Sequence, residues 1–295
     1  MTPVLSVAVV GHVEWVEFLC VGHVPLAGEI VHARRAFAEP GGGGAVAAVQ
    51  LARLAGGATF YTALGNDELG RRSAYELERH GVRVRAVWRA EPQRRTMTFL
   101  DDSGERTITV IGERVAASGE DPLPWAELGS CDAVYVTAGD PRALRAARRA
   151  RVLVATPRIG PALAESAIEI DALVHSATDP GERYAPGDLD PPPHLVVSTA
   201  GADGGSYTDA TGRTGTWQAS ALPGPRVDAY GAGDSFAAGL TFGLSAGLDV
   251  QNALALAADC GARCVSGAGP YGAELDAKTL PSRLRSLLEQ RLPLR

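Results

Sequence analysis

Short apolar runs recur along this chain with helix-like segments between them, and this alternation limits the fold more than any other feature. The first run extends from Val4 to Val10 and ends in Gly11, which is typical of a strand buried on both faces of a sheet. Further strands are expected at Ala58 to Leu64, Ala133 to Thr137, Val152 to Ala155, Ala172 to Val174 and Leu195 to Thr199. Strands and helices that alternate in this way predict a doubly wound α/β sheet with helices on both faces.

Helices are expected mainly in the last third of the chain. Their spans are Asp234 to Ala246, Val250 to about Val265 and Asp276 to Gln290. An earlier helix follows Asp67, which is well placed as its cap, and ends at Gly81.

A second, smaller sheet is expected outside this core. Residues Arg95 to Ile111 contain two β-rich runs joined by Asp101 to Gly104, which is a hairpin signature. The segment Glu29 to Phe37 is a candidate third strand of that sheet. The proline-rich stretch Pro186 to Pro193 is interpreted as a surface loop within one domain, because strand and helix patterns continue on both sides of it.

Composition restricts the partners of the protein. With 295 residues, 45% of them hydrophobic, the chain can bury a large core. Its formal charge of −6 gives no basic excess for binding nucleic acid or an anionic membrane. No apolar stretch approaches the roughly 18 residues of a spanning helix, and the start of the chain lacks a positively charged leader. We therefore expect a cytoplasmic protein without nucleic acid or membrane partners.

The segment most informative about chemistry is DAYGAGDSFAAG, from Asp228 to Gly239. The small residues Gly231, Ala232 and Gly233 precede the expected helix, so backbone amides and the positive end of the helix dipole can hold a phosphate. A carboxylate beside an anion site is badly placed to bind phosphate and well placed to act as a general base. Asp234 is therefore the candidate base, with simple helix capping as the alternative interpretation.

Two motifs resemble the signatures of the PfkB, or ribokinase-like, carbohydrate kinases. The sequence GAGDSF, preceded by Asp228, resembles the second signature, and PGGGGAVAAVQLARLAGGATFYTALGNDELG, from Pro40 to Gly70, resembles the first. The resemblance spans nearly the whole chain. It implies a ribokinase-like three-layer α/β/α fold, as a single kinase domain of residues 1–295. It also implies a small β-sheet lid, from about residues 12–38 and 92–114, inserted in the core.

The same resemblance implies an activity. The protein would transfer the ATP γ-phosphoryl group to a primary hydroxyl of a small sugar-like substrate, with Asp234 as base and the Gly231 to Gly233 turn as anion hole. Mg²⁺ is the implied metal, and some relatives imply a monovalent cation, K⁺, near Asp228. The lid would exclude water, and a homodimer through the lid is expected because some members associate in this way.

Nucleotide-binding positions are also implied by the resemblance. The sequence STAGADG resembles the nucleotide loop of the family and assigns Thr199, Gly201 and Gly204 to ATP; an ordinary strand-to-turn transition is the alternative. The family motif N-x-x-E, which organises the waters around Mg²⁺ and phosphate, aligns with Ser176 to Asp179. Ser176 is thereby assigned to the nucleotide and Asp179 to indirect metal binding, since oxygen donors suit Mg²⁺.

Substrate-binding positions come from the glycine cluster and the hairpin. Gly41, Gly42 and Gly43 correspond to the sugar-site glycines of the family. Arg106, in the expected lid, is a candidate for contact with the substrate or the transferring phosphate. The alternative for Arg106 is an exposed, solvated side chain.

Two positions depart from the family pattern. The family commonly has an Asp after the first strand, where this chain has His12 and Glu14; we assign both to the substrate pocket, with a turn residue as the alternative for His12. Val46, also assigned to the substrate pocket, stands where the family usually has Asn, and valine cannot make the hydrogen bonds of Asn, worth on the order of 1 kcal/mol each. These changes predict an acceptor other than plain ribose or fructose, such as an unusual sugar, a sugar acid or a nucleoside.

Other function classes remain open at this point. One is a nucleoside kinase of the same fold, and another is a non-catalytic nucleotide- or sugar-binding protein with a degenerate substrate site. A third is a nicotinamide-dependent oxidoreductase, but the first strand runs into GHVEW and not into the G-x-G-x-x-G of a dinucleotide site.

Overall fold

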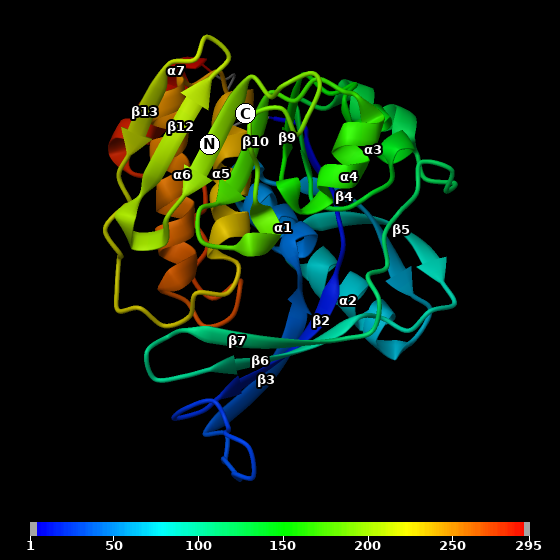
Figure 1. Ribbon diagram of the computed structural model, residues 1–295, viewed down its shortest axis with the longest axis vertical. Coiled ribbons are helices and arrows are strands. Elements are labelled where there is room, and N and C mark those ends of the chain that lie inside the picture. Colours follow the sequence, from blue (N-terminus) through cyan, green and yellow to red (C-terminus); the bar gives the residue numbers. More distant parts are fainter. Residues whose placement is uncertain (1–4, 292–295) are drawn as a thin grey trace.

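The computed structural model describes residues 5–291 and contains two sheets (Figure 1). Within these residues the large sheet has nine strands in the order β13-β12-β11-β10-β9-β8-β1-β4-β5. Their bounds are β1 (Val7–Val10), β4 (Ala58–Gly65), β5 (Val82–Arg89), β8 (Ala133–Val136), β9 (Val152–Ala155), β10 (Ala172–Ser176), β11 (Leu195–Thr199), β12 (Gly205–Asp209) and β13 (Thr214–Trp217). Neighbours from β5 across to β11 pair in parallel, whereas β12 and β13 extend the edge in antiparallel fashion.

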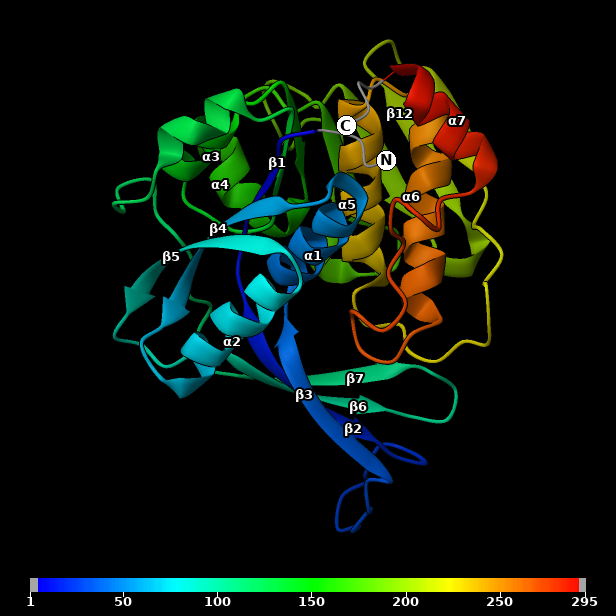
Figure 2. The ribbon, with the colours of Figure 1, turned by 180° about the vertical axis from the view of Figure 1, so that it is seen from behind.

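Helices cover both faces of this sheet (Figures 1 and 2). They are α1 (Gly43–Ala55), α2 (Glu68–Arg79), α3 (Pro141–Ala147), α4 (Gly160–Ser166), α5 (Ala232–Ser245), α6 (Val250–Val265) and α7 (Ser282–Arg291). Val7 and Val9 of β1 pack into the core shared with α1, α5 and α6, while Ala8 and Val10 pack into the core shared with α3 and α4. The apolar run is thus a strand buried on both faces, and the three-layer α/β/α class is confirmed.

The smaller sheet lies against the end of the large one (Figure 2). Its order is β3-β2-β6-β7, with bounds β2 (Glu14–Cys20), β3 (Arg35–Gly41), β6 (Arg95–Leu100) and β7 (Arg106–Ile111). Strand β2 starts shortly after β1 ends, and β3 leads almost directly into α1. The lid is therefore joined to the core at the segments around His12 and Gly41.

Two expected element bounds were wrong. The strand predicted at Glu29 to Phe37 is β3, which starts later, because the Glu29 carboxylate contacts His23 and closes a loop before the strand. The last helix, predicted from Asp276, begins at Ser282. The Asp276 carboxylate instead accepts hydrogen bonds from the amides of the following turn, including that of Thr279. Side-chain bonds of this kind compete with helix formation.

None of the helices between residues 5 and 291 combines the length and apolar composition that crossing a bilayer requires.

Candidate active site

Helix α5 begins at the turn that carries the small residues. Gly231 precedes the helix with a left-handed φ of 80°, and a Cβ there would lie 3.0 Å from Val46 Cγ1, so both backbone and space require glycine. The Ser235 amide donates to the Gly231 carbonyl at 2.9 Å. Within residues 5–291, the amides of Gly233 and Asp234 have no backbone acceptor. Free amides at a helix N-terminus form an anion-binding position.

Asp234 is inside the first turn of α5, so the capping interpretation is wrong. A Cβ on Gly43 would lie 2.6 Å from Asp234 Oδ1, so the carboxylate lies directly against the glycine cluster. Burial, and then the negative charge of Glu182, raises the pKa of Asp234 to about 7. The positive charges of Arg158 and Arg106 act in the opposite direction. A carboxylate with a pKa near neutrality is suited to general base catalysis.

Asp228 and Tyr230 hold the two glycine-rich segments together. Asp228 is fully buried and accepts hydrogen bonds from the amides of Tyr230, at 2.8 Å, and Gly269, at 3.0 Å. Burial raises the pKa of Asp228. The Tyr230 hydroxyl accepts a hydrogen bond from the Gly42 amide at 2.9 Å, and a Cβ on Gly41 would lie 2.6 Å from the same oxygen. Motifs far apart in the sequence therefore meet at one place.

Two buried residues, Val46 and Thr137, lie beside the place where the two glycine-rich segments meet. Val46, in α1, is fully buried and packs against Gly231, so its side chain supports the turn. Thr137 directly follows β8, and its hydroxyl has no hydrogen-bond partner among residues 5–291. A Cβ on Gly11 would lie 2.5 Å from Thr137 Oγ1. Sequence reasoning missed Thr137, whose only signal was its place at the carboxyl end of a central strand.

His12 and Glu14 lie beside the glycine cluster. A Cβ on Gly42 would lie 3.2 Å from His12 Nε2 and from Glu14 Cγ. Glu14 Oε1 is 3.6 Å from His12 Nε2 and 3.1 Å from Arg94 Nε. Burial lowers the pKa of His12, so the imidazole is neutral at pH 7. The structure brings the two predicted residues together and adds Arg94, which the sequence did not single out.

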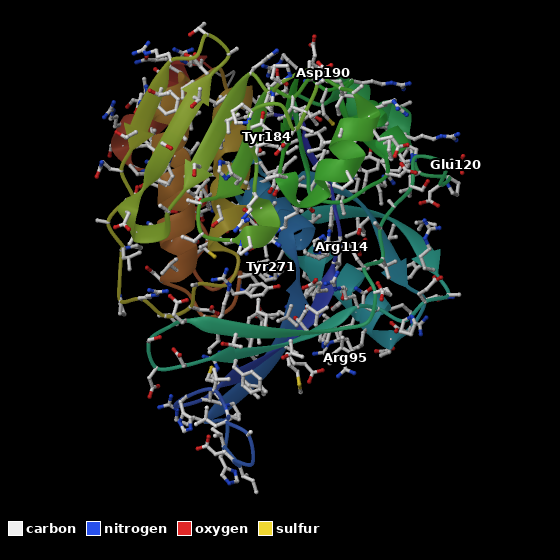
Figure 3. All side chains as sticks on the ribbon, in the orientation of Figure 1. Arg95, Arg114, Glu120, Tyr184, Asp190 and Tyr271 are labelled. Carbon is white, nitrogen blue, oxygen red and sulfur yellow. The ribbon has the colours of Figure 1, made fainter. Side chains whose placement is uncertain are left out.

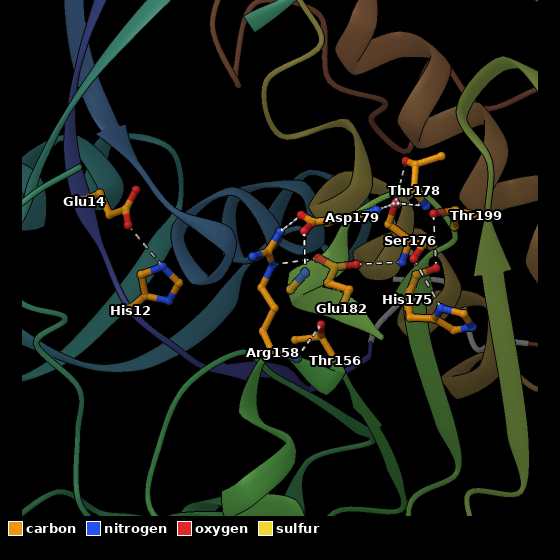
Figure 4. A network of polar contacts seen from close by, with 11 residues as sticks. His12, Glu14, Thr156, Arg158, His175, Ser176, Thr178, Asp179, Glu182 and Thr199 are labelled. Carbon is orange, nitrogen blue, oxygen red and sulfur yellow. Dashed lines mark hydrogen bonds and ion pairs between the residues drawn. The ribbon is translucent and has the colours of Figure 1, made fainter. Parts of the chain in front are cut away.

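A second polar group surrounds Arg158, which follows β9 (Figure 4). Arg158 Nε donates to Glu182 Oε1 at 2.7 Å, and another nitrogen of the guanidinium bonds Asp179. Glu182 Oε2 accepts a hydrogen bond from the Ser176 amide at 2.7 Å. The predicted Ser176 and Asp179 thus lie together, but it is Glu182 whose charge acts on Asp234. The missed signal was a carboxylate in the loop that follows a strand end.

The predicted nucleotide loop follows β11. Thr199 pairs with Ser176 of β10, and its hydroxyl donates to a β10 carbonyl at 3.3 Å. Gly201 is exposed, has a φ of 60°, and a Cβ on it would meet no other atom within 4 Å. Gly204, with a φ of 76°, lies so close to β13 that a Cβ would be 2.3 Å from the Trp217 carbonyl oxygen. Thr199 and Gly201 are accessible for a ligand, while Gly204 shapes the loop.

Two arginines of the lid region contribute positive charge near this site. Arg106 begins β7, and its positive charge lowers the pKa of Asp234. Arg114 follows β7 and lies where the lid meets the core (Figure 3). Burial and the positive charges of Arg94 and Arg158 lower the pKa of Arg114. Sequence reasoning selected Arg106 and missed Arg114.

The acidic side chains of the site would hold Mg²⁺ or K⁺ only together with oxygen atoms from a bound nucleotide or from water. Among residues 5–291, no three His, Cys, Asp or Glu side chains converge on a metal position. Asp179 and Glu182 offer carboxylate oxygens that already bond Arg158, which suits Mg²⁺ held mainly by phosphates and water. Each oxygen of Asp228 already accepts one amide hydrogen bond, so a K⁺ ion there would need further oxygens.

The site lies at the carboxyl ends of strands in a doubly wound sheet, where such folds bind ligands. It combines an open anion position, a carboxylate with a raised pKa and arginines on two sides. Such a combination is typical of sites that transfer phosphoryl groups. The chain belongs to the pfkB family of carbohydrate kinases, whose family model matches residues 4–161 and 169–277.

Individual relatives agree with this assignment. The chain is 28% identical over 270 residues to an ATP-dependent ribose-1-phosphate kinase of Halopiger xanaduensis, covering 85% of this chain and 89% of the relative. Its fold matches the Arabidopsis thaliana ribokinase solved with ribose and ATP, with a TM-score of 0.72, 22% identity and coverage of 98% and 99%. It also matches the Cryptococcus neoformans ribokinase solved with ADP, with a TM-score of 0.71, 20% identity and coverage of 98% and 100%.

Proposed function

We propose that this protein transfers the γ-phosphoryl group of ATP to a primary hydroxyl of a small sugar-like acceptor. The observation that carries the proposal is the Asp234 carboxylate, with its raised pKa, between free helix amides and Gly43. Asp234 takes the proton of the hydroxyl, the acceptor oxygen bonds to the γ-phosphorus, and the bond from that phosphorus to ADP breaks. The Gly231 to Gly233 turn stabilises the charge on the transferring group.

The two ends of the site take different parts of the reactants. ATP lies along the β10 and β11 ends, against Ser176, Thr199 and Gly201, with Gly204 keeping the loop in shape. The acceptor lies at the other end, against the glycine cluster from Gly41 to Gly43 and the side chains of His12 and Glu14. Arg106 reaches from the lid toward the transferring group, and Val46 acts through the turn that it supports.

Cations would assist at the phosphate end. A magnesium ion carried by the ATP phosphates would neutralise their charge, and Asp179 together with Glu182 would hold its waters. Asp228, already fixed by two amides, is the residue that would contribute to a K⁺ position. The protein residues contribute binding, orientation and the base.

The acceptor belongs to the class of small sugar derivatives. A relative named as a ribose-1-phosphate kinase and a fold neighbour solved with ribose make both phosphorylated and neutral pentoses natural test compounds. Nucleosides are included because a nucleoside kinase of the same fold is the alternative that changes only the acceptor.

The direct test is the Asp234→Asn variant, which keeps the shape of the side chain but cannot accept the proton. We expect kcat to fall by about 10²- to 10⁴-fold, the contribution typical of a general base. ADP release is measured with Mg²⁺, ATP and a panel of sugars, sugar phosphates, sugar acids and nucleosides. ATP affinity, measured by calorimetry, should change little. Asp259→Asn, on α6 away from the glycine turn, is the matched control.

A non-catalytic binding protein is the competing function. In that case both reactants bind, and no phosphorylated product forms with any acceptor of the panel. A variant that retains full turnover would instead leave the kinase in place and remove Asp234 from the role of base.

We also propose a homodimer through the lid. Strand β7 is an edge of the smaller sheet, and Ile108, Val110 and Ile111 are exposed on it. An exposed apolar edge strand is a ready surface for pairing with a second chain.

A further inference from the structure

The acceptor end of the site contains more positive than negative charge. The Glu14 carboxylate forms an ion pair with Arg94. The positive charge of Arg114 also acts on Glu14 and lowers its pKa. Within residues 5–291, Arg114 forms no salt bridge, and the charges that act on it are those of Arg94, Glu14 and Arg158. Arg158 is occupied by two carboxylates of its own. The single Glu14 carboxylate therefore lies beside Arg94 and also acts on the charge of Arg114.

Buried donors at the same place lack partners. The side chain of His12 is 7% exposed, and its Nδ1 has no hydrogen-bond partner among residues 5–291. Arg94 is 14% exposed; its Nε is 3.1 Å from Glu14 without the geometry of a hydrogen bond. Leaving a buried polar group without a partner costs free energy, and such groups in native proteins commonly await a ligand or water. His12 and Arg94 therefore offer hydrogen-bond donors to an oxygen atom of the bound acceptor substrate.

His12, Glu14 and Arg94 lie close to Asp234, where the acceptor hydroxyl is proposed to react. His12 and Glu14 contact the Cβ position of Gly42, and the next residue, Gly43, contacts the Asp234 carboxylate. A molecule lying across these two glycines presents one end to Asp234 and the other to Arg94. Arg114 lies at the junction of lid and core (Figure 3), and the charges of Arg94 and Glu14 act on it.

We infer that the acceptor carries an anionic oxygen group, a phosphate ester or a carboxylate, and that Arg94 and Arg114 bind it. This inference rests on the proposed kinase function and specifies its substrate class. Guanidinium groups pair with phosphate and carboxylate through parallel hydrogen bonds, and they are less strongly hydrated than an ammonium group. Arg114 is exposed and Arg94 is half-buried, and an anion between them would shield the two guanidinium groups from each other.

The experiment compares three matched acceptor sets in the wild-type enzyme with Mg²⁺ and ATP. These are ribose 1-phosphate and fructose 6-phosphate, then gluconate and 2-keto-3-deoxygluconate, then ribose, fructose and adenosine. We expect kcat/KM for at least one anionic compound to exceed that for each neutral compound by about 100-fold or more, the effect of two charge-assisted pairs. The first two sets distinguish a phosphate from a carboxylate as the bound group.

Variants then test the two arginines. Arg114→Gln removes the charge of a side chain that holds no salt bridge within residues 5–291, so folding should be preserved, and we expect KM for the anionic acceptor to rise about 10- to 100-fold. The ATP KM should stay within about threefold, since ATP lies at the other end of the site. Arg94→Lys, which keeps the charge and loses the planar fork, should raise the same KM less than Arg94→Gln does. Arg83→Gln, at the amino-terminal start of β5, is the control.

The outcomes separate this inference from the function on which it rests. Turnover that favours a neutral sugar or nucleoside, or an Arg114→Gln variant with unchanged acceptor KM, overturns the anion site and leaves the kinase standing. No ADP release with any acceptor overturns the proposed function itself. In that case, calorimetric binding of the sugar phosphates to the wild type, weakened in Arg114→Gln, would still support the anion site.

Discussion

Asp234, the proposed base, lies in an unfavourable environment for its charge. Its carboxylate is partly buried and lies within the field of Glu182; desolvation and then this charge raise the pKa of Asp234 from the ordinary 3.8 to about 7. The folded protein therefore binds this proton more tightly than the unfolded chain does. The resulting contribution to stability is present at low pH and is lost as the pH rises toward 7. Asp234→Asn should consequently be at least as stable as the wild type above pH 7.

The raised pKa of Asp234 predicts how activity depends on pH. The base must be deprotonated, so kcat/KM should fall as the pH decreases through about 7. Glu182→Gln removes the negative charge that raises this pKa and should shift the acid limb of the profile to lower pH. Profiles of kcat/KM from pH 5 to 9 check both statements, with Glu289→Gln on α7 as control. An acid limb that stays in place in Glu182→Gln would contradict the assigned coupling.

Helices α5 and α6 show how small residues place the catalytic turn. A Cβ on Gly239 of α5 would lie 2.8 Å from both Ala257 Cα and Cys260 Sγ of α6. Further along α5, a Cβ on Gly243 would lie 3.0 Å from Ala253. The two helices approach closely because these positions lack side chains. Since α5 begins at the anion-binding turn, this packing fixes where that turn lies relative to α1 and its glycines.

Replacement of Gly239 by Ala tests this close packing. The added methyl group meets backbone atoms that cannot move freely, so we expect the free energy of unfolding to fall by about 1–3 kcal/mol. The gain in helix propensity, about 1 kcal/mol at most, works against this loss. Urea unfolding measures the change. Gly160→Ala in α4, where a Cβ would meet nothing within 4 Å, should have little effect. Equal stabilities of the two variants would argue against a tight α5–α6 contact.

The site is completed where the lid and the core meet. Strands β2 and β3 leave and re-enter the core at His12 and Gly41, so both ends of this segment carry residues of the proposed acceptor site. The β6–β7 turn also contacts the core, through the ion pair between Glu105 and Arg226. Arg106 is next to Glu105, and its charge acts on Asp234. Movement of the lid would accordingly change acceptor binding more than ATP binding.

The proposed lid dimer has a test of its own. Val110→Lys places a charge on the exposed β7 edge, which opposes strand pairing, so this variant should be monomeric. Sedimentation velocity of the wild type, at tens of micromolar protein, should show a dimer. Tyr75→Lys, at an exposed aromatic residue of α2, should leave that dimer intact. A monomeric wild type would refute the lid interface.

Local patterns in the sequence were sufficient for the layers, the hairpin and the two glycine motifs. Buried strands such as β9 and β11 have the predicted bounds, because an apolar run between turn residues depends only on near neighbours. The antiparallel edge formed by β12 and β13 was not predicted. Those strands are short and partly exposed, so their pairing is determined by contact with β11 and not by their own apolar pattern.

Some residues of the candidate site could be predicted from the sequence, and others could not. Gly231 and Gly43 could be selected from the sequence because a left-handed backbone and a close approach admit few residue types. The sequence could not identify Glu182, Arg94 and Arg114 as site residues. Charged residues are common on protein surfaces, and no local sequence pattern distinguishes these three. Folding brings them within reach of Asp234 and the glycine cluster, and burial there makes their charges strong. Residue type and short spacing thus determined the fold and selected the candidate base, whereas long-range contacts determined the charge environment of Asp234.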